Sequence, residues 1–335
     1  MDKYSVKDFD EYGYCYDIDH YLSNQCYVNS YEVYHYTSPN SLLSILCGDP
    51  DKVNTAKLWF TRFDSLNDRN EQREILDFFN GYCQVKIKDG AIPQKFADSI
   101  SAIQLHTNKL ITIETKEETI DLPHMGGIKC QSTASFEECD VYLCCFSLED
   151  DLLPMWNYYS KSNRYEGYCI GFCESAFTQT EARNLGYYCD IHRVIYDDAE
   201  KTALFDRFLL PLLTDYGKYT QAEDALIMKY VNHFLSEFQF LFKNRAFTHE
   251  KEARAILYIP KRKIENVEGF PIKYRNSNGY IVPYIEYVCP PYSVSSVRVA
   301  PLLEKELAVK NLTEYLENNN YRHVSVLPSE IPIRF

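Results

Sequence analysis

The stretch YEVYHYTSPNSLLSILCG, residues 31–48, contains the first clear strand and the first clear helix of the chain. We predict a strand over residues 31–37. Ser38 and Pro39 are typical of an N-cap and the first helical position, so a short helix should follow at once. Gly48 marks the end of that helix, because glycine adopts a left-handed conformation at little cost. The stretch therefore predicts a strand that leads directly into a helix.

The same plan recurs a few residues later. Residues 57–63 predict a second strand. Asp68, with Glu71 three residues on, forms a capping-box pattern for a helix that ends near Gly81. The same polar residues suit a magnesium site, but the cap explains them sufficiently.

The rest of the chain favours an α+β fold. Its clearest helix covers residues 221–242, where apolar residues recur at spacings of three and four, as in a core helix. Further helices are predicted over 151–160 and 302–317, and further strands over 141–147, 168–172, 191–196, 252–259, 280–288 and 295–299. Strands gathered around mostly short helices predict strand-rich mixed core sheets with flanking helices, and they disfavour a doubly wound parallel sheet.

Domain organisation is expected to be simple. Residues 1–30 form an amino-terminal tail, and residues 31–335 form a single α+β domain. Residues 84–139 are polar and broken by proline and glycine, which indicates an inserted segment with little chemistry of its own.

Composition restricts the partners. The chain has 48 acidic and 35 basic residues and a net charge of -13, which disfavours nucleic acid as a partner. No signal peptide or long apolar run is visible, so we expect a cytoplasmic protein without membrane contact. The 12 cysteines lack the C-x-x-C spacing of a zinc site, and we expect reduced thiols and no metal.

Seven short motifs occur in order along the chain. They are Tyr34 to Thr37, Phe63 to Asp68 with Glu71, Cys145 to Ser147, Met155 to Tyr159, Gly167 to Phe172, Lys243 with Glu250 to Arg254, and Ser329 to Arg334. Together they resemble the bacterial family of domains of unknown function 2971. Arg69 stands where this family usually has proline. The resemblance spans residues 31–335, and the family name assigns no activity.

His35 and Thr37 lie two apart on a predicted strand, so their side chains leave the same face. This pair resembles the first-strand motif of ADP-ribosyltransferases of the His-Tyr-Glu type. The resemblance implies that His35 holds a ribose hydroxyl of NAD and that Thr37 lies near the nicotinamide. The alternative is a buried histidine that bonds to a neighbouring strand.

Glu250 and Glu252 are also two apart, before an apolar strand that ends in Ile259-Pro260. This pattern is similar to the catalytic strand of the same transferases. The resemblance implies that Glu252 stabilises the positive charge on the ribose as nicotinamide leaves, and that Glu250 orients or deprotonates the acceptor. The alternative is a pair of carboxylates that form ion pairs with Arg254 or Lys251.

Three more residues complete the predicted site. Tyr159 or Tyr165 would stack on nicotinamide, as in the transferase segment that the sequence around Ser160-Lys161-Ser162 resembles. Arg254 would bind the NAD pyrophosphate or pair with an acidic residue.

The sequence leads to one main hypothesis about function. It predicts an NAD-dependent ADP-ribosyltransferase or NAD glycohydrolase of a bacterial defence or stress system, whose acceptor is a protein or small molecule. The alternatives are a non-enzymatic sensor or interaction module of such a system, and a magnesium nuclease built on Asp68 and Glu71. Phosphate-binding loops, dinucleotide fingerprints and hydrolase nucleophile motifs are absent from the sequence.

Overall fold

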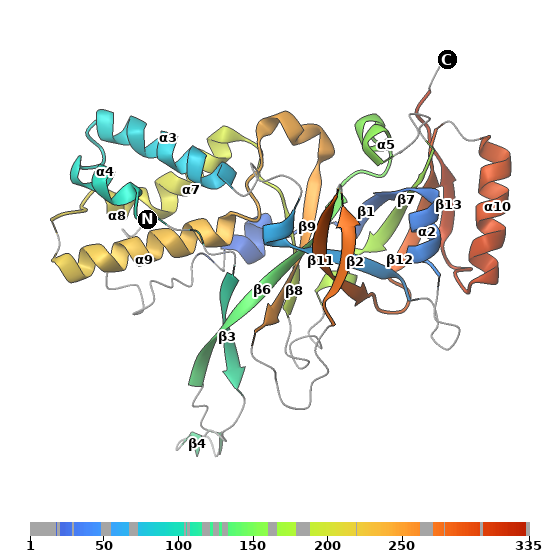
Figure 1. Cartoon of the computed structure of the whole chain (residues 1–335), viewed down its shortest axis with the longest axis horizontal. Helices are drawn as coiled ribbons and strands as arrows, with labels where there is room; N and C mark the ends of the chain where they lie inside the picture. The colour runs from blue at the N-terminus through green and yellow to red at the C-terminus, as the bar shows by residue number, and fades with distance from the viewer. Residues whose placement is uncertain are drawn as a thin grey trace.

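The computed structural model describes residues 18, 21–28, 30–47, 55–66, 73–103, 105, 108–115, 121–122, 127–128, 133–159, 166–178, 188–218, 220–261, 271–277, 279–301 and 304–332. Eleven strands of these residues join in one mixed sheet, and β4 (Asp121–Leu122) pairs with β5 (Gly127–Ile128) apart from it. Helices lie on both sides of the sheet (Figure 1), so the predicted α+β class is confirmed.

Eight strands make the main path of the sheet. Their order is β10 (Lys273–Ser277), β11 (Tyr280–Val288), β2 (Lys57–Arg62), β6 (Thr133–Ser147), β1 (Glu32–Thr37), β7 (Tyr168–Cys173), β12 (Val294–Val299) and β13 (Ser325–Pro328). Among the pairs of named strands that the structure describes, only β12 and β13 run parallel. The two faces of a mainly antiparallel sheet can be covered by different elements, as they are here.

The long strand β6 organises the sheet around the candidate site. One edge pairs with β9 (Glu252–Pro260), which pairs in turn with β8 (Tyr188–Arg193). Along its other edge, β2 pairs with Tyr142 and Leu143, whereas β1 pairs with Ser147. The amino-terminal half of β6 forms a ribbon with β3 (Asn108–Thr115) that projects from the body (Figure 1).

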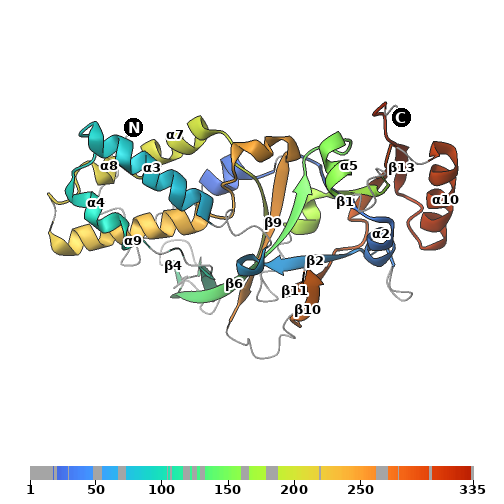
Figure 2. The same ribbon diagram turned by 45° about the horizontal axis from the view of Figure 1, so that its top comes forward.

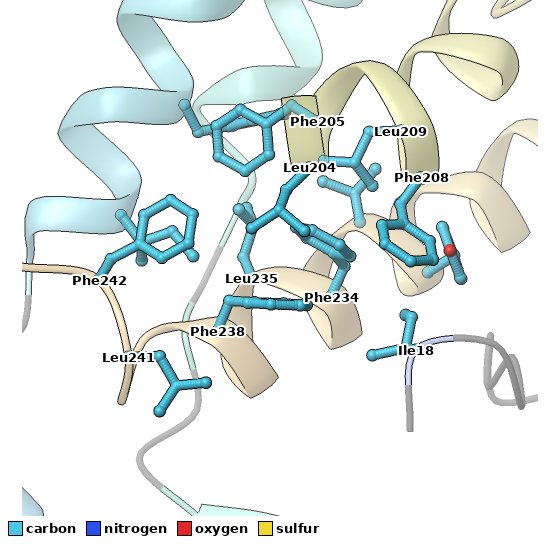
Figure 3. Packing of buried hydrophobic residues seen from close by; sticks show 14 of the residues in the cluster. Ile18, Leu204, Phe205, Phe208, Leu209, Phe234, Leu235, Phe238, Leu241 and Phe242 are labelled. Atoms are coloured by element: carbon cyan, nitrogen blue, oxygen red, sulfur yellow. The ribbon is translucent and has the colours of Figure 1, made fainter. Parts of the chain in front are cut away.

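One face of the sheet is covered by a helical layer. It contains α3 (Glu74–Lys88), α4 (Lys95–Ile100), α7 (Asp198–Phe208), α8 (Leu210–Leu213) and α9 (Gln221–Phe238). A phenylalanine-rich core fills the space between these helices, with Phe205, Phe234 and Phe238 at its centre (Figure 3). The aromatic stripe predicted for the helix after residue 220 is therefore packing.

The opposite face has a core of its own. There α2 (Pro39–Ile45) and α10 (Lys305–Asn318) pack with Phe60, Phe146 and Phe172 of the sheet. The Ser38 hydroxyl caps α2 by accepting from the Ser41 amide, as the sequence predicted. A further helix, α5 (Leu153–Tyr159), lies beside the start of β9 in two views of the molecule (Figures 1 and 2).

Two predictions about elements were wrong. The helix predicted to end near Gly81 continues as α3 to Lys88, because Phe79, Tyr82 and Cys83 are buried in the helical core and offset the cost of one glycine. Residues 84–139 were predicted to be irregular, yet they contain α4, β3 and part of β6. The strands β3 and β6 form by pairing with residues that are distant in the sequence. The local sequence does not reveal this pairing.

The described helices include none that is both long and apolar enough to cross a membrane.

Candidate functional site

The carboxylates of Glu250 and Glu252 meet at the amino group of Lys243. Lys243 Nζ lies 2.6 Å from Glu250 Oε2 and 2.7 Å from Glu252 Oε2. Glu250 ends the short 3₁₀ helix η6 (Arg245–Glu250), and Glu252 begins β9. Between them Lys251 adopts a left-handed conformation with φ 45°, which is uncommon for a residue other than glycine. This turn brings the two carboxylates together, and the alternation of side chains along a strand does not.

Glu252 is held on every side. Its Oε1 accepts a hydrogen bond from Arg254 Nε at 2.8 Å, and its Oε2 accepts from Arg254 Nη2 at 3.1 Å as well as from Lys243. The Cys145 thiol also donates to this carboxylate. Burial alone would raise the pKa of Glu252, but the charges of Arg254 and Lys243 outweigh it and lower the pKa to about 2. Glu252 is therefore a fixed, buried anion.

Glu250 is the more open of the two carboxylates. Its side chain is 18 % exposed, compared with 6 % for Glu252. Its Oε2 accepts from Lys243, and its backbone oxygen accepts from the Ser147 hydroxyl at 2.9 Å. Among the described residues, no hydrogen bond reaches Glu250 Oε1. One oxygen of Glu250 therefore has no hydrogen bond from the described residues, whereas both oxygens of Glu252 are bonded.

The helix α5 contacts η6 through Tyr158, whose hydroxyl lies 2.8 Å from His249 Nε2. The next residue, Tyr159, ends α5 and is 42 % exposed as a whole. Nevertheless its pKa is raised, first by burial of the hydroxyl and then by the nearby Cys145, Glu252 and Glu250. The Tyr159 ring stacks on that of Tyr36, with centroids 6.4 Å apart and planes at 27°.

His35 and Thr37 lie on the other face of the sheet. Tyr34 pairs with Ser147, and Ser147 pairs with Glu252, so these three side chains share one face. His35 is one residue out of phase with that row, and its ring packs against Phe146 in the opposite core. The structure does not bring His35 to the carboxylates.

His35 has a structural partner where it lies. Its Nδ1 is 3.2 Å from the carbonyl oxygen of Cys145, at the point where β1 and β2 separate along the edge of β6. Burial lowers the pKa of His35, although the bond to Cys145 opposes this shift, so the ring is neutral and Nδ1 donates its proton. The alternative interpretation of His35, a histidine bonded to a neighbouring strand, is confirmed.

The remaining predicted residues divide into two groups. Arg254 is only 1 % exposed, and it donates from Nε and Nη2 to Glu252 and from Nη1 to the Phe240 carbonyl. It anchors Glu252 and does not face a ligand. Tyr165, Asp68 and Glu71 lie outside the described residues.

Sequence reasoning overlooked the residue that joins the site. Lys243 was noted only as a landmark, yet it bridges both carboxylates and lies seven residues before the first of them. A buried pair of carboxylates needs a cation nearby, so a lysine shortly before the Glu-x-Glu-x-Arg pattern was the available signal. Tyr196 was also missed, and its hydroxyl accepts from the backbone amide of Glu252 at 3.0 Å.

Comparison with known proteins shows that residues 155–255 match a family model described as Protein of unknown function (DUF2971). The matched segment begins in α5 and ends in β9, so it includes Tyr159, Lys243, Glu250, Glu252 and Arg254. No curated protein and no solved structure matches the chain. The match agrees with the resemblance found in the sequence over this segment and assigns no activity.

Proposed function

We propose that the chain acts on NAD, either transferring its ADP-ribose to an acceptor or hydrolysing it, with Glu250 as the reacting carboxylate. One observation carries this proposal: Glu250 is fixed by Lys243 through one oxygen, no described residue bonds to the other, and α5, which ends in the half-exposed Tyr159, contacts the residue before Glu250. A fixed anion beside an aromatic ring suits a ligand that combines a flat ring with a developing positive charge.

In this proposal the two carboxylates have different roles from those that the sequence predicted. When the bond between nicotinamide and ribose breaks, its electron pair leaves with nicotinamide and the ribose carbon becomes positive. In this proposal Glu250 stabilises that charge and then takes the proton of the acceptor as the new bond forms. Glu252 is neutralised by Arg254 and Lys243, so its role is to hold Lys243, and through it Glu250, in place.

Nicotinamide release from NAD by purified protein tests this proposal. Glu250→Gln should lower the rate about 100-fold, because it removes a preorganised charge opposite the reacting centre. Glu149→Gln is the matched control: this carboxylate is half exposed and pairs with Lys251, so the rate should stay near that of the wild type. Release that is unchanged in Glu250→Gln contradicts the assignment. The acceptor, whether water, a protein or a small molecule, would follow from which product carries the ADP-ribose.

A second candidate is a non-enzymatic sensor or interaction module of a bacterial defence or stress system. It is favoured by the separation of His35 from Glu252 across the sheet and by the internal neutrality of the cluster, in which two carboxylates face two cations. Thermal melting with excess NAD distinguishes the candidates. NAD at about 100 times its dissociation constant should stabilise an NAD-binding fold by roughly 2.7 kcal/mol, whereas the module should show no shift.

A further inference from the structure

The segment after β13 is bound to the loop that precedes α5. Asp151, in that loop, accepts hydrogen bonds from the Ser329 hydroxyl at 2.8 Å and from the Glu330 amide at 2.7 Å. The same carboxylate accepts from Trp156 Nε1, on α5, at 2.8 Å. The Asp151 side chain is 14 % exposed, so these three bonds are largely shielded from water. One side chain thus connects the carboxyl-terminal segment with α5.

Trp156 contacts Tyr36, which in turn contacts Tyr159. Its indole is 2 % exposed and packs edge-on against the Tyr36 ring, with centroids 4.8 Å apart. The Tyr36 hydroxyl donates to the Glu149 carbonyl and accepts from the Leu152 amide, which fixes that ring. Tyr159 stacks on Tyr36, and the preceding residue of α5, Tyr158, bonds through its hydroxyl to His249 Nε2 at 2.8 Å, next to Glu250. An unbroken series of contacts therefore runs from Ser329 to Tyr159.

Asp150, next to Asp151, makes a different set of contacts. Its Oδ2 accepts from Arg298 Nε at 2.8 Å and from Arg298 Nη2 at 2.6 Å, and Arg298 donates to the Pro328 carbonyl. Among the described residues, Asp150 forms no hydrogen bond or ion pair with α5. Two adjacent carboxylates of the same kind thus hold the carboxyl-terminal segment, but only Asp151 also holds the helix that carries Tyr159.

We propose that Asp151 is a positioning residue of the candidate site: by joining Trp156 to Ser329 and Glu330, it sets Tyr159 against the Glu250–Lys243–Glu252 cluster. The inference rests on the proposed function where it concerns NAD. By this inference the carboxyl-terminal segment supports the site but does not contact the substrate. The expected consequence is a change in ground-state binding, because Tyr159 would stack on the nicotinamide and Glu250 would do the chemistry.

The test compares Asp151→Asn with Asp150→Asn in a Trp59→Phe background, in which Trp156 is the remaining tryptophan. Both variants change a carboxylate to an amide of the same size, so each serves as the control for the other. Loss of a charged acceptor in Asp151→Asn should expose the Trp156 indole and shift its fluorescence to longer wavelength. Amide hydrogen exchange over residues 153–159 should become about tenfold faster. Asp150→Asn should leave both signals as they are.

The values of KM and kcat for NAD distinguish a positioning role of Asp151 from a purely structural one. Asp151→Asn should raise KM about tenfold and change kcat less than about twofold, since stacking contributes to binding and not to the reaction. Equal exchange and emission in the two variants would overturn the inference, and so would a fall in kcat with unchanged KM. If wild-type protein released no nicotinamide, the proposed function would fail, and fluorescence and exchange would still decide whether Asp151 positions α5.

Discussion

At the scale of single residues, charge balance explains the candidate site. Glu252 is buried as an anion because Arg254 and Lys243 surround it, and an unpaired charge at that depth would cost several kcal/mol. The same lysine holds Glu250, which is nearer the surface. The carboxylate that two cations surround and the carboxylate that is more exposed are therefore different residues, two positions apart.

The depressed pKa of Glu252 leads to a pH-dependent prediction. A carboxylate with a pKa of about 2 when folded and about 4.5 when unfolded contributes stability that is complete above pH 4.5 and is lost as the pH falls toward 2. Glu252→Gln should destabilise the fold by about 3 kcal/mol near neutral pH, and the difference from wild type should shrink below pH 4.5. Chemical denaturation at several pH values measures it. A difference that does not change between pH 7 and pH 3 would rule out this account.

At the scale of elements, local capping signals mark the starts of α2 and α9, whereas packing decides where α3 ends. The capping box of Thr220 and Glu223 is present at the start of α9, and Ser38 caps α2. By contrast, α3 runs through Gly81 because the residues around that glycine are buried against other helices. Glycine signals an end only where no tertiary contact outweighs its cost.

Gly81 and Gly171 differ in the space around them, so substitution by alanine should have opposite effects at the two positions. Gly81 is exposed within α3, and an added Cβ there would meet nothing within 4 Å. Gly81→Ala should therefore stabilise the protein by about 1 kcal/mol. Gly171 lies within β7, where an added Cβ would collide with the Ser296 hydroxyl and crowd that of Ser295. Gly171→Ala should lower the melting temperature, and a rise would show that β7 can move away from β12.

At the scale of the whole molecule, a single sheet joins two cores. Val141 and Leu143 of β6 belong to the helical core, and Tyr142 and Cys144 belong to the core on the other face. The same alternation separates His35 from Glu252. Loss of β6 would expose both cores at once, so they should not unfold separately.

Coincident unfolding is the prediction that follows. Helical circular dichroism reports mainly on the helical layer, whereas Trp59 and Trp156 both lie outside its core. Thermal or denaturant curves from circular dichroism and from tryptophan fluorescence should have the same midpoint. A fluorescence transition clearly displaced from the helical one would mean that the two cores are independent units.

The sequence by itself determined the α+β class, most elements with strong local signals, and the Glu-x-Glu-x-Arg pattern at the start of β9, because capping, periodicity and residue type act over a few positions. It predicted the strand of His35 correctly. Which face of the sheet His35 takes relative to Glu252 follows from the fold, since it depends on the register that pairs Tyr34 with Ser147 and Ser147 with Glu252, residues more than 100 positions apart in each pair. The tertiary structure also decided that Lys243 lies between two carboxylates and that Asp151 meets Ser329, because charge balance and hydrogen bonding at these points join segments that only folding brings together.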